Sequence, residues 1–163
     1  MPNPADLILS ASGTGPVFTA VGDVYRVLAS GEQTGGAYAL IEVRVLPGGG
    51  PPPHLHRREE ESFYILAGEI TFFLTDHKIA AKPGAFVQMP RNTPHAFKNE
   101  GATDARMLLL VTPAGFEDFI KEFGSPAVSL DVTPPPVTEA DIARLLEVAP
   151  KYGIEVLTPP VER

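Results

Sequence analysis

Proline and glycine interrupt this chain at short intervals, with 18 and 15 copies respectively among 163 residues. They make up about a fifth of the sequence, which is high for a helical protein and below the roughly 25–30 % typical of disordered chains. Both residues break regular structure, so long helices are excluded over most of the chain. The sequence instead predicts many short strands joined by tight turns.

Short runs rich in β-branched and aromatic residues extend from about Val17 to Val111, with no amphipathic helix between them. Their spacing indicates an all-β sandwich or small antiparallel barrel. We expect a hairpin turn at Thr75–Lys78. The expected strands are Val24–Ala29, Tyr38–Leu46, Ser62–Ala67, Glu69–Leu74, Ala85–Gln88, His95–Lys98 and Arg106–Val111.

Composition excludes several classes of protein. The length suits one domain, and a net charge of −7 disfavours nucleic acid and anionic membrane surfaces as partners. The chain has no cysteine, so any metal must be held by nitrogen and oxygen ligands. No apolar run is long enough to span a bilayer, and Met1–Ser12 lacks the pattern of a secretory signal. We therefore expect a soluble, cytoplasmic protein.

Two helices are expected in a C-terminal extension, residues 113–163, that follows the β region, residues 1–112. The first would bury Phe116, Phe119, Ile120 and Phe123 and end at Gly124. The second would begin at Thr138, which forms a capping box with Asp141, and would present Ile142, Leu145, Leu146 and Ala149 on one face. Between them, Ser125–Pro136 reads as an extended linker. We expect both helices to pack on the barrel or on a partner subunit.

The first group of reactive residues follows a glycine- and proline-rich stretch. His54 and His56 are two apart, so on a strand both imidazoles face the same side. Of the three glutamates that follow, Glu61 shares its face with Phe63 and Ile65 and is the one expected to be buried, near a cation. The stretch from Arg57 to Glu59 is expected to be a solvated charge run.

His95 lies in a second neighbourhood, after a proline-flanked turn and on the same strand face as Phe97. It could provide a third nitrogen ligand, although a lone histidine on a strand is more often a core or rim residue. The fourth histidine, His77, is expected at the exposed hairpin turn. If Glu61 points inward, Tyr64 and Leu66 point outward, and this apolar face needs cover from a partner subunit or from the C-terminal helices.

Both neighbourhoods resemble the paired signatures of the cupin superfamily. The matching positions are Gly48, His54, His56, Glu61 and Gly68 in the first signature, and Gly84, Pro90, His95 and Asn99 in the second. Asn92 stands where glycine is usual, and asparagine tolerates the left-handed backbone that such a turn needs. Among cupins, the chain is most similar to single-barrel proteins of the quercetin 2,3-dioxygenase type.

The resemblance implies a small antiparallel barrel of the jelly-roll type, often a homodimer, with one divalent metal held by His54, His56, Glu61 and His95. Such a ligand set suits Fe, Mn, Co, Ni or Zn. It also implies a metal-dependent dioxygenase in which Glu61 acts as ligand and proton acceptor, on a flat aromatic or enolisable small molecule. The alternatives are a non-oxidative isomerase, lyase or decarboxylase, and a ligand-binding barrel without catalysis. The expected substrate-pocket residues are Phe63, Ile65, Phe86, Gln88 and Phe97.

Overall fold

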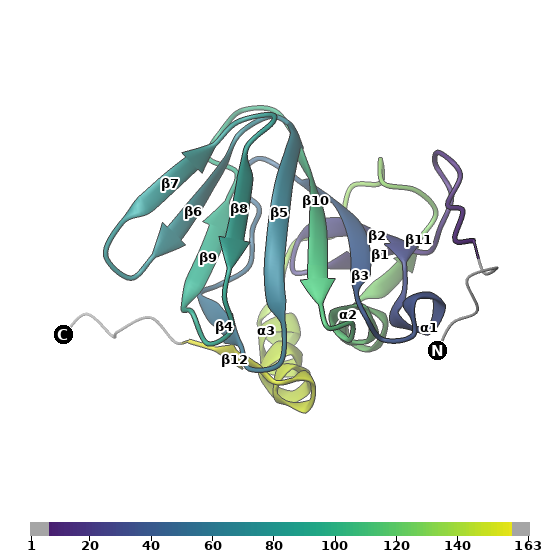
Figure 1. Cartoon of the computed structure of the whole chain (residues 1–163). Helices are drawn as coiled ribbons and strands as arrows, with labels where there is room; N and C mark the ends of the chain where they lie inside the picture. Colours follow the sequence, from purple (N-terminus) through teal and green to yellow (C-terminus); the bar gives the residue numbers. More distant parts are fainter. Residues whose placement is uncertain (1–6, 158–163) are drawn as a thin grey trace.

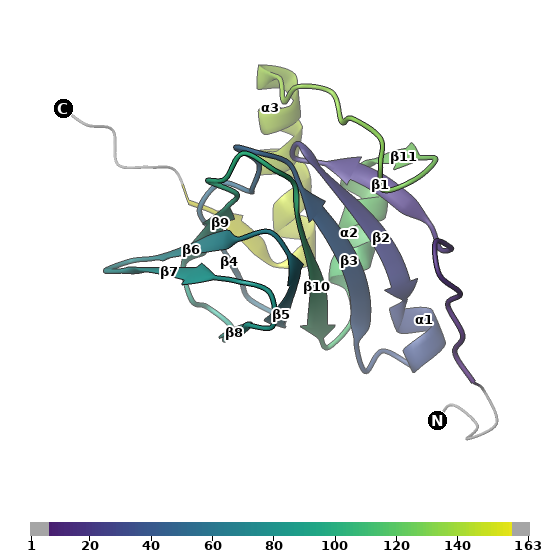
Figure 2. The same ribbon diagram turned by 90° about the horizontal axis from the view of Figure 1, so that it is seen from above.

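The structure, a computed structural model, describes residues 7–157, so the outer ends of the expected segments 1–112 and 113–163 lie outside it. Its strands form two antiparallel sheets that face each other (Figures 1 and 2). The larger sheet has the order β11 (Ser125–Ala127), β1 (Val17–Ala20), β2 (Asp23–Ala29), β3 (Ala39–Val45), β10 (Ala105–Thr112), β5 (Glu60–Ala67) and β8 (Phe86–Met89). The smaller has the order β12 (Ile154–Val156), β4 (His54–His56), β9 (His95–Lys98), β6 (Ile70–Leu74) and β7 (Lys78–Ala81).

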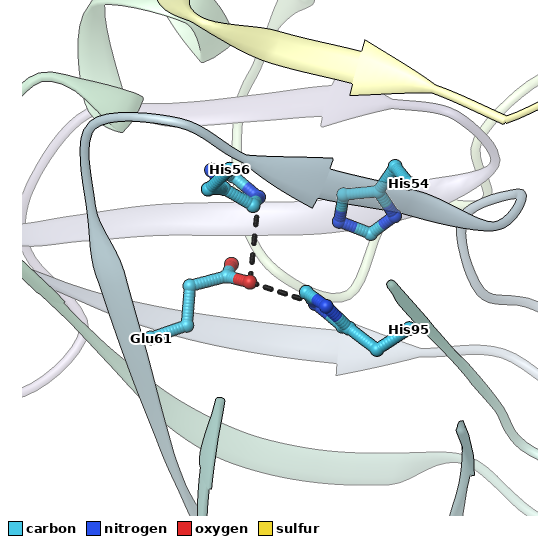
Figure 3. Close-up of side chains that lie close together, drawn as sticks. All are labelled: His54, His56, Glu61 and His95. Atoms are coloured by element: carbon cyan, nitrogen blue, oxygen red, sulfur yellow. Dashed lines mark hydrogen bonds and ion pairs between the residues drawn. The ribbon is translucent and has the colours of Figure 1, made fainter. Parts of the chain in front are cut away.

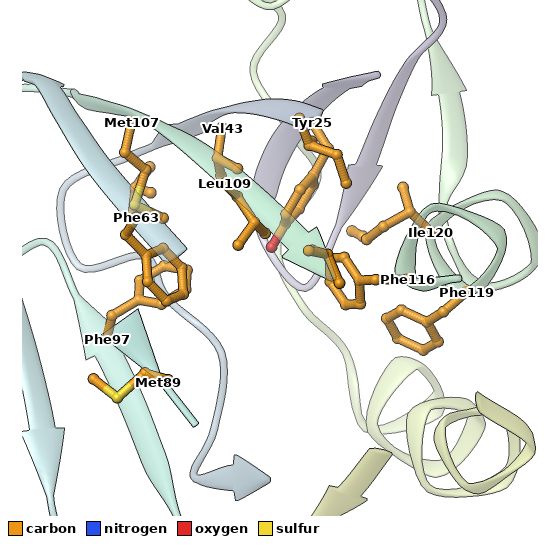
Figure 4. Packing of buried hydrophobic residues seen from close by; sticks show 14 of the residues in the cluster. Tyr25, Val43, Phe63, Met89, Phe97, Met107, Leu109, Phe116, Phe119 and Ile120 are labelled. Atoms are coloured by element: carbon orange, nitrogen blue, oxygen red, sulfur yellow. The ribbon is translucent and has the colours of Figure 1, made fainter. Parts of the chain in front are cut away.

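This arrangement is a jelly roll, which confirms the expected all-β class. Hydrogen bonding among the described strands gives two separate sheets, so the barrel is flattened into a sandwich. On β3, β5 and β10, fully buried residues alternate with half-buried or exposed ones, so one face of the larger sheet points inward. Figure 4 shows part of the resulting core, in which Phe63 and Phe97 pack edge to face with ring centroids 5.9 Å apart.

The C-terminal extension contributes to both sheets. Its first strand, β11, pairs with β1 at the edge of the larger sheet, in a segment where the sequence predicts only a linker. Its last strand, β12, pairs with β4 at the edge of the smaller sheet. Three-residue strands carry too little periodicity to be recognised in a sequence. Both strands form because a partner strand distant in sequence pairs with them.

The expected C-terminal helices are present as α2 (Phe116–Phe123) and α3 (Glu139–Val148), the latter followed by the 3₁₀ turn η1 (Ala149–Tyr152). In α2 the apolar residues spaced three and four apart are buried, as predicted. In α3 the capping box of Thr138 and Asp141 is confirmed. The buried stripe of α3 differs from the prediction, because Leu145 is buried whereas Ile142 and Leu146 stay exposed.

The outer face of β5 is exposed, as predicted, with Tyr64 45 % and Leu66 42 % accessible. The C-terminal helices do not cover it, since α2 packs against β1 and β3 and α3 packs against α2. A second subunit on this face stays a prediction. In the part of the chain that the structure describes, no helix combines the length and apolar character needed to cross a bilayer.

Besides β11, β12 and η1, four further short elements were not anticipated as separate units. They are β1, β4 as a hydrogen-bonded strand, β7 and the single-turn helix α1 (Gly31–Thr34). The hairpin before β7 falls where predicted, with the amide of Leu74 donating to the carbonyl oxygen of His77 over 2.9 Å. His77 is exposed at this turn and pairs with Asp76.

Asp23, at the start of β2, is a fully buried carboxyl group. It makes no hydrogen bond of good geometry within the described chain, and Gly49 packs so closely that a Cβ there would lie 2.4 Å from its Oδ1 atom. Burial raises the pKa of Asp23 to about 8, although the nearby amides of Leu46 and Gly50 act to lower it. The carboxyl group is therefore neutral at neutral pH and gains its proton when the chain folds.

Folding raises the pKa of Asp23, so the neutral carboxyl group favours the folded state. This stabilisation is complete below the pKa of the unfolded chain, and it is lost as the pH rises toward the folded pKa of about 8. Asp23→Asn keeps the shape of the side chain and removes the titration. We expect the variant to gain stability relative to wild type with rising pH, by up to about 1.4 kcal/mol per pH unit. Urea unfolding of both proteins in chelator, across this pH range, measures the difference. A difference that stays constant with pH would contradict the assignment.

Candidate metal centre

Four buried side chains from both sheets meet at one point (Figure 3). His54 and His56 come from β4, His95 from β9 and Glu61 from β5. His54 and His95 are direct cross-strand partners, which places their rings side by side with centroids 4.5 Å apart. One donor atom from each of the four residues lies within 4.8 Å of every other. The sequence motifs therefore converge as predicted.

A protein oxygen orients each imidazole through its Nδ1 atom. The carbonyl oxygen of Pro52 lies 2.8 Å from Nδ1 of His54, and that of Thr93 lies 2.9 Å from Nδ1 of His95. For His56, the Glu59 carboxylate lies 3.3 Å from Nδ1. A carbonyl or carboxylate oxygen only accepts, so each Nδ1 carries the proton and donates. The Nε2 atoms are left to face the centre.

The Nε2 atoms gather around one oxygen of Glu61. The Oε2 atom lies 2.8 Å from Nε2 of His95 and 3.3 Å from Nε2 of His56. Nε2 of His56 is buried and makes no hydrogen bond of good geometry in the described structure. A buried nitrogen without a partner, facing a carboxylate and two other imidazoles, has the chemistry expected of a ligand for a divalent cation.

The surroundings of the centre shift the pKa values of Glu61, His54 and His56. Burial alone would raise the pKa of Glu61, but the three imidazoles outweigh it and lower that pKa to about 2. Burial lowers the pKa of His54 to about 4 despite the attraction of Glu61. Burial also opposes charge on His56, but Glu61 and Glu59 together raise its pKa above the ordinary value. Glu61 is thus ionised and His54 neutral at neutral pH, the forms that coordinate a metal.

A narrow cavity of about 40 Å³ adjoins this group. Apart from the group itself, its described wall is nearly all apolar. The wall residues are Val21, Tyr25, Pro51, Pro52, Phe97, Leu109, Phe116, Leu145, Ile154 and Val156. The ring of Phe116 packs against His56 at a centroid distance of 5.5 Å, so α2 shields one side of the centre.

Residues 41–111, which include all four converging side chains, match the family model described as Cupin domain. The chain belongs to the cupin superfamily. It is 26 % identical over 126 residues to quercetin 2,3-dioxygenase of Bacillus subtilis, a match that covers 77 % of this chain and 37 % of that protein. It is 30 % identical over 118 residues to germin-like protein subfamily 2 member 2 of Arabidopsis thaliana, covering 69 % and 52 %. The chain thus spans between about a third and a half of these relatives' lengths.

Solved structures support the fold of this cupin. A protein named as a predicted oxalate decarboxylase from Thermotoga maritima superposes with a TM-score of 0.59 at 23 % identity, over 66 % of this chain and 99 % of that one. KdgF from Halomonas sp. gives a TM-score of 0.55 at 20 % identity, over 62 % and 91 %. At these identities the likeness concerns the fold alone.

Two tight turns in this cupin bring the ligand strands together. Asn92 takes the left-handed conformation predicted for it, with φ of 63°, and its amide donates to the carbonyl oxygen of His56 over 2.8 Å. Gly50 has a φ of 131°, and a Cβ there would lie 2.0 Å from the carbonyl oxygen of Phe97. Only glycine permits that approach of the loop before β4 to β9.

The predicted substrate-pocket residues divide into three groups. Phe97 lies in the cavity wall. Phe63 and Ile65 share the inward face with Glu61, but they are fully buried in the core. The prediction that Phe86 and Gln88 line the pocket is wrong. They pair with Tyr64 and Ser62 on the outer face of the sheet, where Phe86 is 64 % exposed. The alternation on β8 is one residue out of phase with the prediction, and a shift of one residue reverses the face.

Glu59 was also placed wrongly, because it is 3 % exposed rather than solvated. Its carboxylate holds Nδ1 of His56, and a Cβ on Gly115 would approach its Oε1 atom at 3.3 Å. Glu60, its neighbour, faces outward and accepts a hydrogen bond from Gln88. Strand parity separates Glu61 from Glu60, but no sequence signal distinguishes Glu59, which orients a ligand, from a solvated charge.

We expect metal affinity to fall in a graded series. His56→Ala removes a donor and should abolish tight binding of Zn²⁺, whereas Glu59→Gln leaves all donors in place and weakens the orientation of His56. Loss of such an outer partner typically reduces metal affinity by about 10- to 100-fold. Titration of the chelator-treated proteins with Zn²⁺ measures each affinity. His77→Ala and Glu60→Gln are the matched controls, and a Glu59→Gln affinity equal to that of Glu60→Gln would contradict the role of Glu59.

Proposed function

We propose that this cupin is a metal-dependent dioxygenase acting on a flat, mostly apolar small molecule that offers an ionisable oxygen. The observation that carries the proposal is the convergence of three imidazoles and one carboxylate beside a cavity whose wall is, apart from His54, His56 and Glu61, almost entirely apolar. Such a wall suits an aromatic or enolisable substrate better than a sugar, which needs many hydrogen-bonding partners. The similarity to a quercetin 2,3-dioxygenase supports the oxidative chemistry.

The residues present fit one divalent ion of the Fe, Mn, Co, Ni or Zn group, because all four donors are nitrogen or carboxylate oxygen and Nε2 of His56 is otherwise unpaired. When bound, the ion would act as a Lewis acid and provide positions where substrate oxygen and O₂ could meet. Glu61, ionised because the imidazoles lower its pKa, would accept the substrate proton. The apolar wall, including Phe116 and Leu109, would exclude water from the reacting oxygen.

The cavity sets a condition on substrate entry. Its volume of about 40 Å³ is far below the roughly 300–1,000 Å³ of sites that hold drug-sized ligands. The C-terminal extension provides part of the wall through Leu145, Ile154 and Val156. A substrate that contains a ring therefore requires β12 and α3 to move away from β4, and we include this opening in the proposal.

A non-oxidative isomerase, lyase or decarboxylase would use the same ligands. Oxygen dependence separates the two classes. We expect the protein loaded with Fe²⁺, Mn²⁺, Co²⁺ or Ni²⁺ to consume quercetin and O₂ in equal amounts, with no turnover in anaerobic solution. An oxygen electrode and the loss of flavonol absorbance measure both. Glu61→Ala should lose this activity, and product formation without O₂ uptake would overturn the oxidative assignment. If no metal supports turnover of quercetin in air, the assignment as a dioxygenase for flavonol-like substrates fails.

The opening of the C-terminal wall can be tested without a known substrate. Leu55 and Glu155 are cross-strand partners on β4 and β12, where Cα atoms of such pairs lie about 5.5 Å apart at most, within the roughly 4.4–6.8 Å range of disulfides. The chain has no cysteine of its own, so Leu55→Cys with Glu155→Cys would create a single pair. We expect the oxidised variant to release its metal to phenanthroline more slowly than the reduced variant. Equal rates in both redox states would show that β12 does not need to move.

A further inference from the structure

Tyr25 lies beside the metal centre but outside the residues that match the cupin model. It is on β2, is 4 % exposed, and lines the same cavity as His54, His56 and Glu61. Figure 4 shows its ring pointing inward from the larger sheet, with the hydroxyl group near Leu109 and Phe116, which also line the cavity. The phenol oxygen thus faces the space next to the four converging side chains.

The hydroxyl group is chemically isolated within that wall. Apart from the metal-ligating group, Tyr25 has the only polar side chain among the described wall residues, the others being proline, aliphatic or phenylalanine. Burial and two carboxyl groups of the described chain, rather than a hydrogen bond, shift the pKa of this phenol. A buried tyrosine hydroxyl normally has a partner, because burial without one costs free energy that phenylalanine would avoid.

The phenol is held in its neutral form. Burial raises the pKa of Tyr25 well above its usual value, and the carboxylate of Glu61, joined by that of Asp23 once the pH exceeds the pKa of Asp23, raises it further. A neutral phenol keeps its proton and can donate it in a hydrogen bond. The nearby Glu61 carboxylate would repel a phenolate, so the phenol remains a hydrogen-bond donor.

We propose that Tyr25 donates a hydrogen bond to an oxygen atom of the molecule bound at the metal centre and thereby selects oxygen-bearing ligands and fixes their orientation. This inference rests on the proposed function, because it needs a metal with an open position. It assigns a substrate-contacting residue to a strand that precedes the residues matching the cupin model. The expected ligand group is a carboxylate, enolate or phenolate oxygen.

The test uses Co²⁺, whose visible absorption reports the ligands around it, and formate as a small oxygen-donor probe. Tyr25→Phe removes one oxygen atom and retains the ring, so the cavity wall keeps its shape. Tyr64→Phe makes the same change on the exposed outer face and is the matched control. Full-length proteins are loaded with Co²⁺ and titrated with formate, and the affinity for Co²⁺ is measured separately.

We expect Tyr25→Phe to bind Co²⁺ as tightly as wild type and to bind formate about 10- to 100-fold more weakly, the usual effect of losing a hydrogen bond to a charged group. Tyr64→Phe should match wild type in both measurements. Equal formate affinities in wild type and Tyr25→Phe would overturn the role of Tyr25 and leave the metal centre intact. If wild type binds Co²⁺ without responding to formate, the inference also fails. A wild-type protein that does not bind Co²⁺ would overturn the proposed function itself.

Discussion

The structure depends on how the charge of Glu61 is accommodated between the two sheets. An ionised carboxylate that is 3 % exposed is unstable unless positive or hydrogen-bonding groups surround it. Here the larger sheet provides the carboxylate and the smaller sheet provides all three imidazoles. The same four side chains therefore form the candidate metal centre and join the two sheets. The phenylalanine core beside them fixes the distance between the sheets.

The motif residues allowed much of the centre to be predicted. Strand parity selected Glu61 over Glu60, and the resemblance to the paired cupin signatures implied the ligand set that the structure brings together. Glu59 escaped prediction because its burial depends on α2 and Gly115, which are distant in sequence. Phe86 and Gln88 were placed on the wrong face because four residues on an edge strand carry too little alternation to fix the phase.

The same division applies to the fold. Long segments with clear periodicity, such as β3, β10 and α2, were predicted nearly to their ends. Elements of three or four residues, such as β11 and β12, exist because a partner strand pairs with them, and a local pattern cannot reveal a partner. The α3 stripe was misjudged for a related reason: the contacts of Leu145 with the cavity, not helix periodicity alone, decide which side of α3 is buried.

Because β12 pairs with β4, the smaller sheet cannot be completed until residue 156 has been synthesised. The histidine strand lies next to the edge of its sheet, and its outer neighbour includes residue 156 of the chain. During synthesis, β4 would leave the ribosome with one row of amides and carbonyls unsatisfied, open to pairing with another nascent chain. The prolines that precede His54 donate no hydrogen bond and shorten that open row until the last strand arrives.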